Sequence, residues 1–230
     1  TSEANRGKYL AFTESGTAPV THLQELAEAG VTHFHVLPAF DIASVNEDLS
    51  QQLSLDSTVG DLCVATNASA TICDGRDPSL VLRDIIEAFD PDTADAQDLI
   101  NSLRGLDAFN WGYDPHHFNA PDGSYASDPD GVARILEMRA MNQALHGMGL
   151  RVVMDVVYNH TQSSGINDNS VFDKIVPGYY HRLNADSGAV ETSTCCQNTA
   201  PENRMMGKFV ADSLVQWAQA YGVDGFRFDI

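Results

Sequence analysis

The chain has 230 residues, with 13 Lys and Arg against 32 Asp and Glu, so its formal net charge is −19. Hydrophobic residues make up 43% of the chain and charged residues 20%, which is typical of a globular protein and excludes a disordered, collagen-like or coiled-coil chain. No uninterrupted apolar run of about 18 residues occurs, so we expect no transmembrane segment. Strong negative charge repels phosphate groups, so we expect no nucleic acid and no anionic membrane as partner. A neutral or cationic partner suits the chain better, and a sugar would be neutral. Acidity that only keeps a protein soluble is the simpler alternative.

Four cysteines are too few for a disulfide scaffold. Cys63 and Cys73 flank a polar stretch and could close a small loop, whereas a disulfide between the neighbours Cys195 and Cys196 would be strained. No Cys-x-x-Cys pair occurs, which argues against a structural zinc site. Cysteines in polar loops favour an oxidising compartment.

The first third of the chain predicts a helix, a strand and an insert. Residues 20–30 have a helical pattern that ends at a glycine, and residues 31–38 (VTHFHVLP) form a β-rich run closed by a proline. Residues 41–105 are polar and rich in Asp, with one apolar-periodic patch at 80–89 that favours a helix. We expect an elaborated loop there, of the kind that often carries function on a rigid scaffold.

The second half gives sharper signals. Asp128-Pro129 is typical of a helix start, and an apolar stripe follows it as far as Gly149. Residues 150–157 (LRVVMDVV) predict a strand buried on both faces. A second helix is expected to begin at the Thr-x-x-Glu pattern of residues 199–202, and residues 223–230 (VDGFRFDI) predict the next strand.

Strands that alternate with helices predict an α/β fold with a parallel sheet and right-handed crossovers. Parallel strands present functional residues at their carboxyl ends, in barrels and in open sheets alike. Three such strands are visible, whereas a closed barrel of this class has eight, so the chain would be less than half of one.

Charged residues at the strand ends carry the chemical information. Alternation in residues 223–230 places Gly225, Arg227 and Asp229 on one face of the strand. Neighbouring guanidinium and carboxylate groups neutralise each other, and the guanidinium favours the ionised carboxylate. An ionised carboxylate at a strand end is a suitable nucleophile for a sugar carbon with oxocarbenium character. A buried ion pair that only fixes packing is the alternative on alternation alone.

Asp155 repeats this pattern in the preceding strand, with Asn159 and His160 just beyond its end. One such motif is weak evidence, because a capping Asn and a loop His would explain it. Two adjacent strands that end in charged residues predict a shared site.

These residues also resemble a known family. DVVYNH at 155–160 and GFRFD at 225–229 are similar to the first two conserved regions of the α-amylase superfamily of glycoside hydrolases. NWGYDP at 110–115, GSYA at 123–126 and DKIVPGYY at 173–180 resemble type I pullulanases and plant limit dextrinases. The resemblance is strong over 109–230 and weaker at 6–10 and 31–40, and the segment 41–105 contributes little.

The resemblance implies which fold the chain adopts and how much of that fold its residues cover. It implies a partial (β/α)8 TIM barrel covering about strands 2 to 4, with residues 1–230 as the N-terminal half of the catalytic barrel. Residues 41–105 would be the insert, and residues 160–200 the loop after the third barrel strand. The rest of the barrel would be needed for stability. The sequence starts without Met and without a signal-peptide pattern, so we expect a processed chain or a piece of a longer one.

The resemblance also implies roles for single residues. Asp229 would be the nucleophile that forms the glycosyl-enzyme intermediate, with Arg227 orienting it. His160 and Asp155 would line the subsite of the attacked sugar, and Tyr113 would stack on its ring.

The same region offers roles for four further residues. Trp111 would shape the wall beside Tyr113, or would pack in the core behind it. Asp114 would brace the site. His116 and His117 are candidates for outer subsites, although loop histidines are more often only solvated.

The implied activity is a debranching hydrolase that cleaves α-1,6-glucosidic bonds in pullulan, amylopectin and limit dextrins with retention. Retaining hydrolysis uses two carboxylates about 5–5.5 Å apart, and the family's general acid, a Glu, belongs to a strand after Ile230. The 230 residues alone are therefore expected to be inactive. An α-1,4-acting amylase or isoamylase, and a non-catalytic α-glucan-binding module, are the alternatives.

The resemblance bears on cofactors and location as well. No cofactor is required, although calcium is common in the superfamily and NDN at 167–169 offers oxygen ligands that match no EF-hand loop. TCCQN at 194–198 is similar to a segment of bacterial pullulanases, which favours a secreted or cell-surface bacterial protein, and two free thiols remain the alternative there.

Overall fold

A computed structural model describes residues 1–193 and 195–230, so Thr194 of the 194–198 motif lies outside the described residues. The chain divides into two compact units, one formed by residues 1–43 and 111–230 and the other by residues 44–110. Each unit has its own cluster of buried apolar side chains. A membrane-spanning helix is absent from the described part of the chain.

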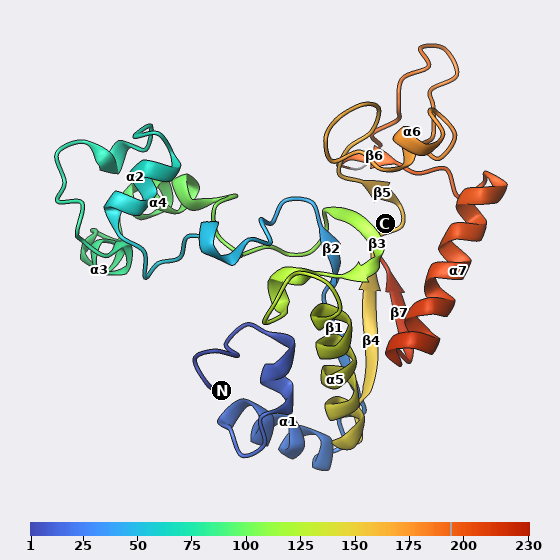
Figure 1. Ribbon diagram of the computed structural model, residues 1–230, viewed down its shortest axis with the longest axis horizontal. Coiled ribbons are helices and arrows are strands. Elements are labelled where there is room, and N and C mark those ends of the chain that lie inside the picture. The colour runs from blue at the N-terminus through green and yellow to red at the C-terminus, as the bar shows by residue number, and fades with distance from the viewer. Residues whose placement is uncertain (194) are drawn as a thin grey trace. The chain divides into compact units, whose positions relative to one another are not determined.

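The centre of the first unit is a three-stranded parallel sheet in the order β1-β4-β7 (Figure 1). Its strands are β1 (His33–Val36), β4 (Arg151–Val156) and β7 (Gly225–Phe228), so the three predicted strands all occur, each shorter than expected. β4 is almost continuously apolar up to Asp155 because it lies between two neighbours and under helices. In the register, Asp155 lies beside Arg227.

Two long helices precede the second and third strands of this sheet. α5 (Ala133–Gly147) and α7 (Arg204–Tyr221) contribute Met138, Met141 and Trp217 to the same buried cluster as β4. The indole Nε1 of Trp217 donates to the carbonyl of Phe118, 2.9 Å away, and thereby fixes α7 to the strand β3 (Pro115–Pro121). Asn142 Nδ2 of α5 donates to the last carbonyl of α7, that of Tyr221, at 2.9 Å.

Helix starts differ from the sequence prediction. α5 begins at Ala133 rather than at Asp128-Pro129, because Oδ1 of Asp128 accepts the backbone N–H of Asp130 in a turn and Gly131 has a positive φ of 66°. The prediction that a helix begins with a capping box at residues 199–202 was also wrong. Thr199 Oγ1 donates to the carbonyl of Tyr158, and Glu202 pairs with Arg182, so α7 begins only at Arg204.

The remaining elements of the first unit are short. α1 (Ala18–Glu28) corresponds to the predicted first helix and follows the 3-10 helix η1 (Tyr9–Thr13). β2 (Phe40–Ile42) pairs antiparallel with β3 (Pro115–Pro121), which is followed by the 3-10 helix η4 (Gly123–Tyr125). In the stretch after β4, β5 (His160–Thr161) pairs with β6 (Gln197–Asn198), and α6 (Phe172–Ile175) lies between them in sequence.

Residues 44–110, which include most of the stretch 41–105 expected as an elaborated loop, contain three short helices and their own core. α2 (Val59–Ala65), α3 (Leu82–Ala88) and α4 (Asp95–Leu103) follow the 3-10 helix η2 (Leu49–Gln51), and η3 (Thr71–Cys73) lies between the first two. α3 corresponds to the apolar patch at 80–89. Short helices separated by Asp-rich turns give little periodicity, which is why the sequence showed only one of them.

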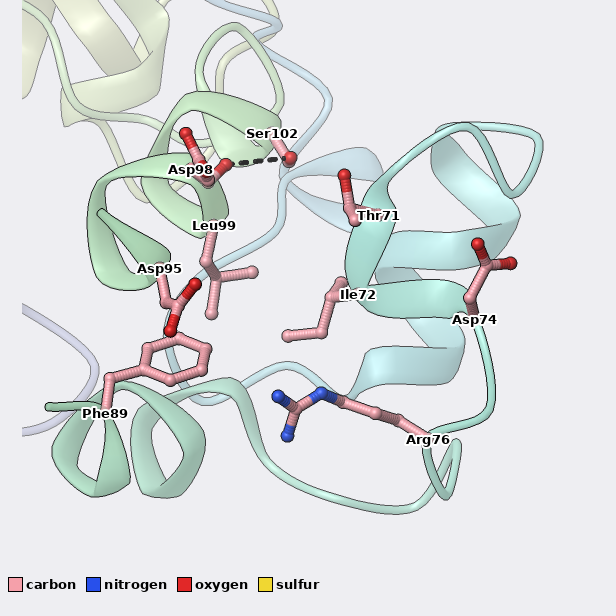
Figure 2. A pocket seen from close by; sticks show the side chains of 9 residues that line it. All are labelled: Thr71, Ile72, Asp74, Arg76, Phe89, Asp95, Asp98, Leu99 and Ser102. Carbon is pink, nitrogen blue, oxygen red and sulfur yellow. Dashed lines mark hydrogen bonds between the residues drawn. The ribbon is translucent and has the colours of Figure 1, made fainter. Parts of the chain in front are cut away.

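A disulfide joins Cys63 of α2 to Cys73 of η3, so the loop that the sequence allowed is present. Beside it, this unit has a cavity of about 270 Å³, and Figure 2 shows Ile72 and Arg76 pointing toward Phe89 across it. The guanidinium of Arg76 lies 5.5 Å from the centre of the Phe89 ring, a cation–π contact. The residues that line this cavity all belong to residues 44–110, outside the strands that carry the predicted chemistry.

Candidate active site

The charged residues predicted at the strand ends lie together at the carboxyl ends of β4 and β7. Arg227 follows Phe226, whose side chain packs against the buried cluster, so alternation turns Arg227 to the other face. There its Nη1 donates to both oxygens of Asp155, at 3.0 and 2.9 Å, and to Oδ1 of Asp229, at 2.8 Å. A single guanidinium nitrogen therefore joins the two carboxylates.

The carboxylates of Asp155 and Asp229 differ in their exposure to solvent. The side chain of Asp155 is 3% exposed, whereas that of Asp229 is 22% exposed. Within the described part of the chain, no hydrogen bond reaches Oδ2 of Asp229. Asp155 is thus enclosed by its partners, and Asp229 has an oxygen left for an outside group. The hydrogen bond to Asp155 is the main reason that the pKa of Arg227 rises above its usual value, so this guanidinium is always cationic.

Tyr113 enters the same cluster from the loop before β3. Its phenol donates to Oδ2 of Asp155, at 2.9 Å. Burial first, and then the hydrogen bond to the Asp155 carboxylate, raise the pKa of Tyr113 above its usual value. The phenol therefore stays protonated and remains a donor near neutral pH.

His160, at the start of β5, holds the backbone of that tyrosine. Its Nε2 lies 2.8 Å from the carbonyl of Tyr113, and because a carbonyl only accepts, Nε2 carries the proton in this contact. The imidazole is almost fully buried, and its Nδ1 has no hydrogen-bond partner among the described residues. In this arrangement His160 positions Tyr113.

The other two predicted residues, Trp111 and Asp114, flank Tyr113 in the same segment of the chain. Trp111 is 63% exposed, so the alternative that it packs in the core behind Tyr113 is wrong. Asp114 is half-buried, and its carbonyl accepts the N–H of Ala43 at 2.8 Å, which ties the segment after Tyr113 to the end of β2.

Two residues that sequence reasoning did not assign also lie at the site. His35 of β1 places Nε2 3.9 Å from Oδ2 of Asp155. Its position near the end of the first parallel strand was the available signal. Sγ of Cys195 lies 3.9 Å from Nε2 of His160, and Cys195 is paired with Cys196, the neighbour with which the sequence predicted only a strained disulfide. Joined sulfurs provide no thiolate for a metal.

In the segment at 167–169, which the sequence suggested for calcium, the two asparagines contact the protein through their amide nitrogens. Asn167 Nδ2 donates to the carbonyl of Ser164 at 2.8 Å, and Asn169 Nδ2 lies 3.5 Å from the carbonyl of Ala43. Both amides therefore turn their donors, rather than their oxygens, toward the protein.

Comparison with known proteins gives consistent results across nearly the whole chain. Residues 42–109 match the family model described as the Pullulanase Ins domain. The chain is 46% identical to a pullulanase of Klebsiella aerogenes and 44% identical to the chloroplastic Pullulanase 1 of Arabidopsis thaliana, in each case over 98% of this chain and 21% of the relative. A solved structure of Klebsiella pneumoniae pullulanase complexed with maltotriose matches 99% of this chain and 22% of that one, with a TM-score of 0.91 and 43% identity.

The chain thus spans about a fifth of the length of the curated relatives it matches. Identity above 40% over nearly all residues, together with the shared fold, is far more specific than the strand-end motifs alone. The chain therefore belongs to the pullulanase family.

Proposed function

We propose that the chain forms part of the catalytic barrel of a debranching glycoside hydrolase, one that cleaves α-1,6-glucosidic bonds in pullulan and branched α-glucans. Two kinds of evidence support this. The relatives are named pullulanases, and one of them was solved with maltotriose, an α-glucan. In addition, Arg227 and Asp229 lie where parallel strands place functional groups.

The sheet order supports a partial (β/α)8 barrel. β1, β4 and β7 are parallel, neighbouring strands in chain order, and the last two are each preceded by a long helix (Figure 1). Within the described residues, β1 and β7 pair on one side only. We propose that further strands of a longer polypeptide pair with these two edges, because closure is how a barrel satisfies its outer strands.

The mechanism assigned to this site is retaining hydrolysis. A carboxylate oxygen of Asp229 attacks the anomeric carbon, a covalent glycosyl–Asp229 ester forms, and the bond to the leaving sugar oxygen breaks. Water then cleaves the ester and restores the carboxylate. Arg227 orients Asp229, Asp155 holds Arg227, and Tyr113 offers an aromatic face to the sugar. The acid that protonates the leaving oxygen would come from outside these 230 residues, so the chain alone should be inactive.

One observation carries this assignment: Asp229 is held by Arg227 but retains an oxygen that nothing in the described part of the chain occupies. Asp229→Asn in the natural polypeptide that carries these residues tests it. We expect pullulan hydrolysis to fall by about three orders of magnitude or more, since a retaining enzyme without its nucleophile loses the covalent route. Asp212→Asn, at a carboxylate that is 64% exposed on α7, is the matched control and should leave hydrolysis unchanged.

The products and the binding behaviour separate the alternatives. Maltotriose as the product of pullulan identifies α-1,6 cleavage, whereas panose or isopanose would identify an α-1,4-acting enzyme. Affinity for α-glucans with no turnover in the unmodified polypeptide would identify a binding module. Undiminished hydrolysis by the Asp229→Asn variant would remove Asp229 from the mechanism.

We also propose that the protein is exported by a bacterial cell. The Cys63–Cys73 disulfide supports this, because disulfides persist in oxidising compartments. Fractionation of the producing cell, with antibody detection, tests the location: cytosolic protein with both cysteines reduced would contradict export.

A further inference from the structure

A second group of chemically active side chains in the first unit consists of residues to which the proposed mechanism assigns no role. It consists of Asp41 on β2 and the adjacent histidines His116 and His117 on β3. One ligand atom from each of the three lies within 4.8 Å of the other two. Carboxylate and imidazole groups in such proximity are typical ligands of a transition metal.

An irregular strand pairing brings both histidines to the same carboxylate. Asp41 is the register partner of His117, and Ile42 is the partner of Pro115, so one step along β2 corresponds to two steps along β3. His116 is the additional residue of this bulge. Adjacent side chains of a regular strand point to opposite faces, whereas a bulge redirects one of them. As a result, the two imidazole rings lie side by side with centroids 4.0 Å apart.

The two carboxylate oxygens of Asp41 have different neighbours, and one of them lies near both histidines. Oδ2 of Asp41 faces both rings, since it makes a short contact with Nδ1 of His117 and lies 3.7 Å from Nδ1 of His116. The other oxygen, Oδ1, lies 4.0 Å from Nη1 of Arg134. The guanidinium and the histidines therefore use different oxygens of the same group.

Asp41 is the most buried of the three side chains, and His117 is the most exposed to solvent. The side chain of Asp41 is 11% exposed, that of His116 25% and that of His117 52%. An ion can therefore reach the group from solvent, and water can complete its coordination. In this arrangement Nδ1 of His117 carries a proton, because it donates to the carboxylate oxygen Oδ2 of Asp41. Metal binding would displace that proton or shift it to Nε2, after which Nδ1 of each ring presents a lone pair to the ion.

We propose that Asp41, His116 and His117 form a binding site for Zn²⁺ or a chemically similar divalent transition metal. Two nitrogens and one carboxylate oxygen suit Zn²⁺, whereas Ca²⁺ and Mg²⁺ prefer oxygen ligands. The ion would link β2 to β3 shortly after Tyr113 in the chain. Its effect would be to stabilise the pairing that presents the loop of Tyr113, with no part in bond cleavage.

Titration calorimetry with ZnCl₂ on the natural polypeptide, freed of metal by a chelator, tests this proposal. We expect one equivalent of Zn²⁺ to be bound through this group, and His116→Asn or His117→Asn to weaken that binding at least tenfold. His22→Asn is the matched control, because His22 lies on α1 with 69% of its side chain exposed and a carboxylate, that of Glu25, 3.9 Å away. Zinc binding that is absent, or unchanged in both variants of the site, would overturn the proposal.

A measurement on the unmodified protein covers the case in which a variant fails to fold. Diethyl pyrocarbonate modifies accessible neutral imidazoles, and mass spectrometry of peptides locates each modified residue. Zn²⁺ should protect His116 and His117 together and leave His22 reactive. Equal modification of His116 and His117 with and without Zn²⁺ would count against the site.

Discussion

Asp155 and Arg227 are register partners in neighbouring parallel strands, and one guanidinium nitrogen of Arg227 lies within 3.0 Å of both carboxylate oxygens of Asp155. The same nitrogen reaches Asp229. Asp155 is therefore the buried residue that determines where Arg227 can be, and Arg227 in turn orients the more exposed carboxylate. We propose that Asp155 acts indirectly, through Arg227, rather than by lining the sugar subsite as the resemblance implied.

Asp155→Asn should lower pullulan hydrolysis by the natural polypeptide about 10- to 100-fold, because a hydrogen bond to a charged group is worth about 1.5–3 kcal/mol. The amide keeps the size of the side chain but loses the charge that holds Arg227. The rate constant kcat should fall more than KM rises, since Asp229 would be less well oriented. Steady-state kinetics on pullulan measure both, and an unchanged kcat would contradict the positioning role.

Tyr113→Phe separates the ring of Tyr113 from its hydroxyl. The phenylalanine keeps an aromatic face but loses the 2.9 Å hydrogen bond to Asp155. We expect a decrease of about tenfold in kcat/KM, from the loss of one hydrogen bond to a carboxylate, and a larger decrease for Tyr113→Ala, which also loses the ring. Equal values for the two variants would mean that the ring does not contact the sugar.

Trp217→Phe should destabilise the first unit by about 2 kcal/mol, because the indole is fully buried and its loss leaves both a cavity and an unpaired carbonyl at Phe118. Val215→Ala, at a side chain on the same helix that is 51% exposed, is the control and should change stability by no more than about 0.5 kcal/mol. Urea unfolding followed by far-ultraviolet circular dichroism measures both, and equal effects would argue against a specific role for the indole.

Asp173 predicts an acid-sensitive contribution to stability. Burial raises its pKa, but the N–H groups of Gly165 and Gly178 and the nearby His181 outweigh burial, so the pKa lies below the usual value of 3.8. A carboxyl whose pKa is lower in the folded than in the unfolded state stabilises the fold above the unfolded value. This contribution is then lost as the pH falls through the folded value.

Asp173→Asn should therefore be less stable than the parent protein near neutral pH, with the difference shrinking below about pH 4. Denaturant unfolding at a series of pH values measures this. Asp168→Asn serves as a comparison, because Lys174 donates to the backbone carbonyl of Asp168 rather than to its carboxylate. The stability of this variant should follow that of the parent at every pH. A difference between the Asp173→Asn variant and the parent that does not depend on pH would show that the asparagine acts through packing alone.

The three parallel strands and the two long helices followed from local patterns, because apolar periodicity and strand alternation are properties of neighbouring residues. Helix starts were less predictable. Asp128-Pro129 and Thr199–Glu202 both look like helix caps, but the first forms a turn and the second is used by Tyr158 and Arg182, which are distant in sequence. Competition for the same polar groups by residues far along the chain has no local signal.

The sequence by itself determined that Arg227 and Asp229 share one face at the end of a strand, because side chains of a strand alternate with a period of two residues. Only the tertiary structure decided how these residues and their neighbours act on one another. Sheet register placed Asp155 beside Arg227, the chain's return at β5 brought His160 to Tyr113, and a bulge turned His116 toward Asp41. Each of these contacts joins residues that are far apart along the chain, and such a separation is closed by packing and strand pairing, which no local pattern records.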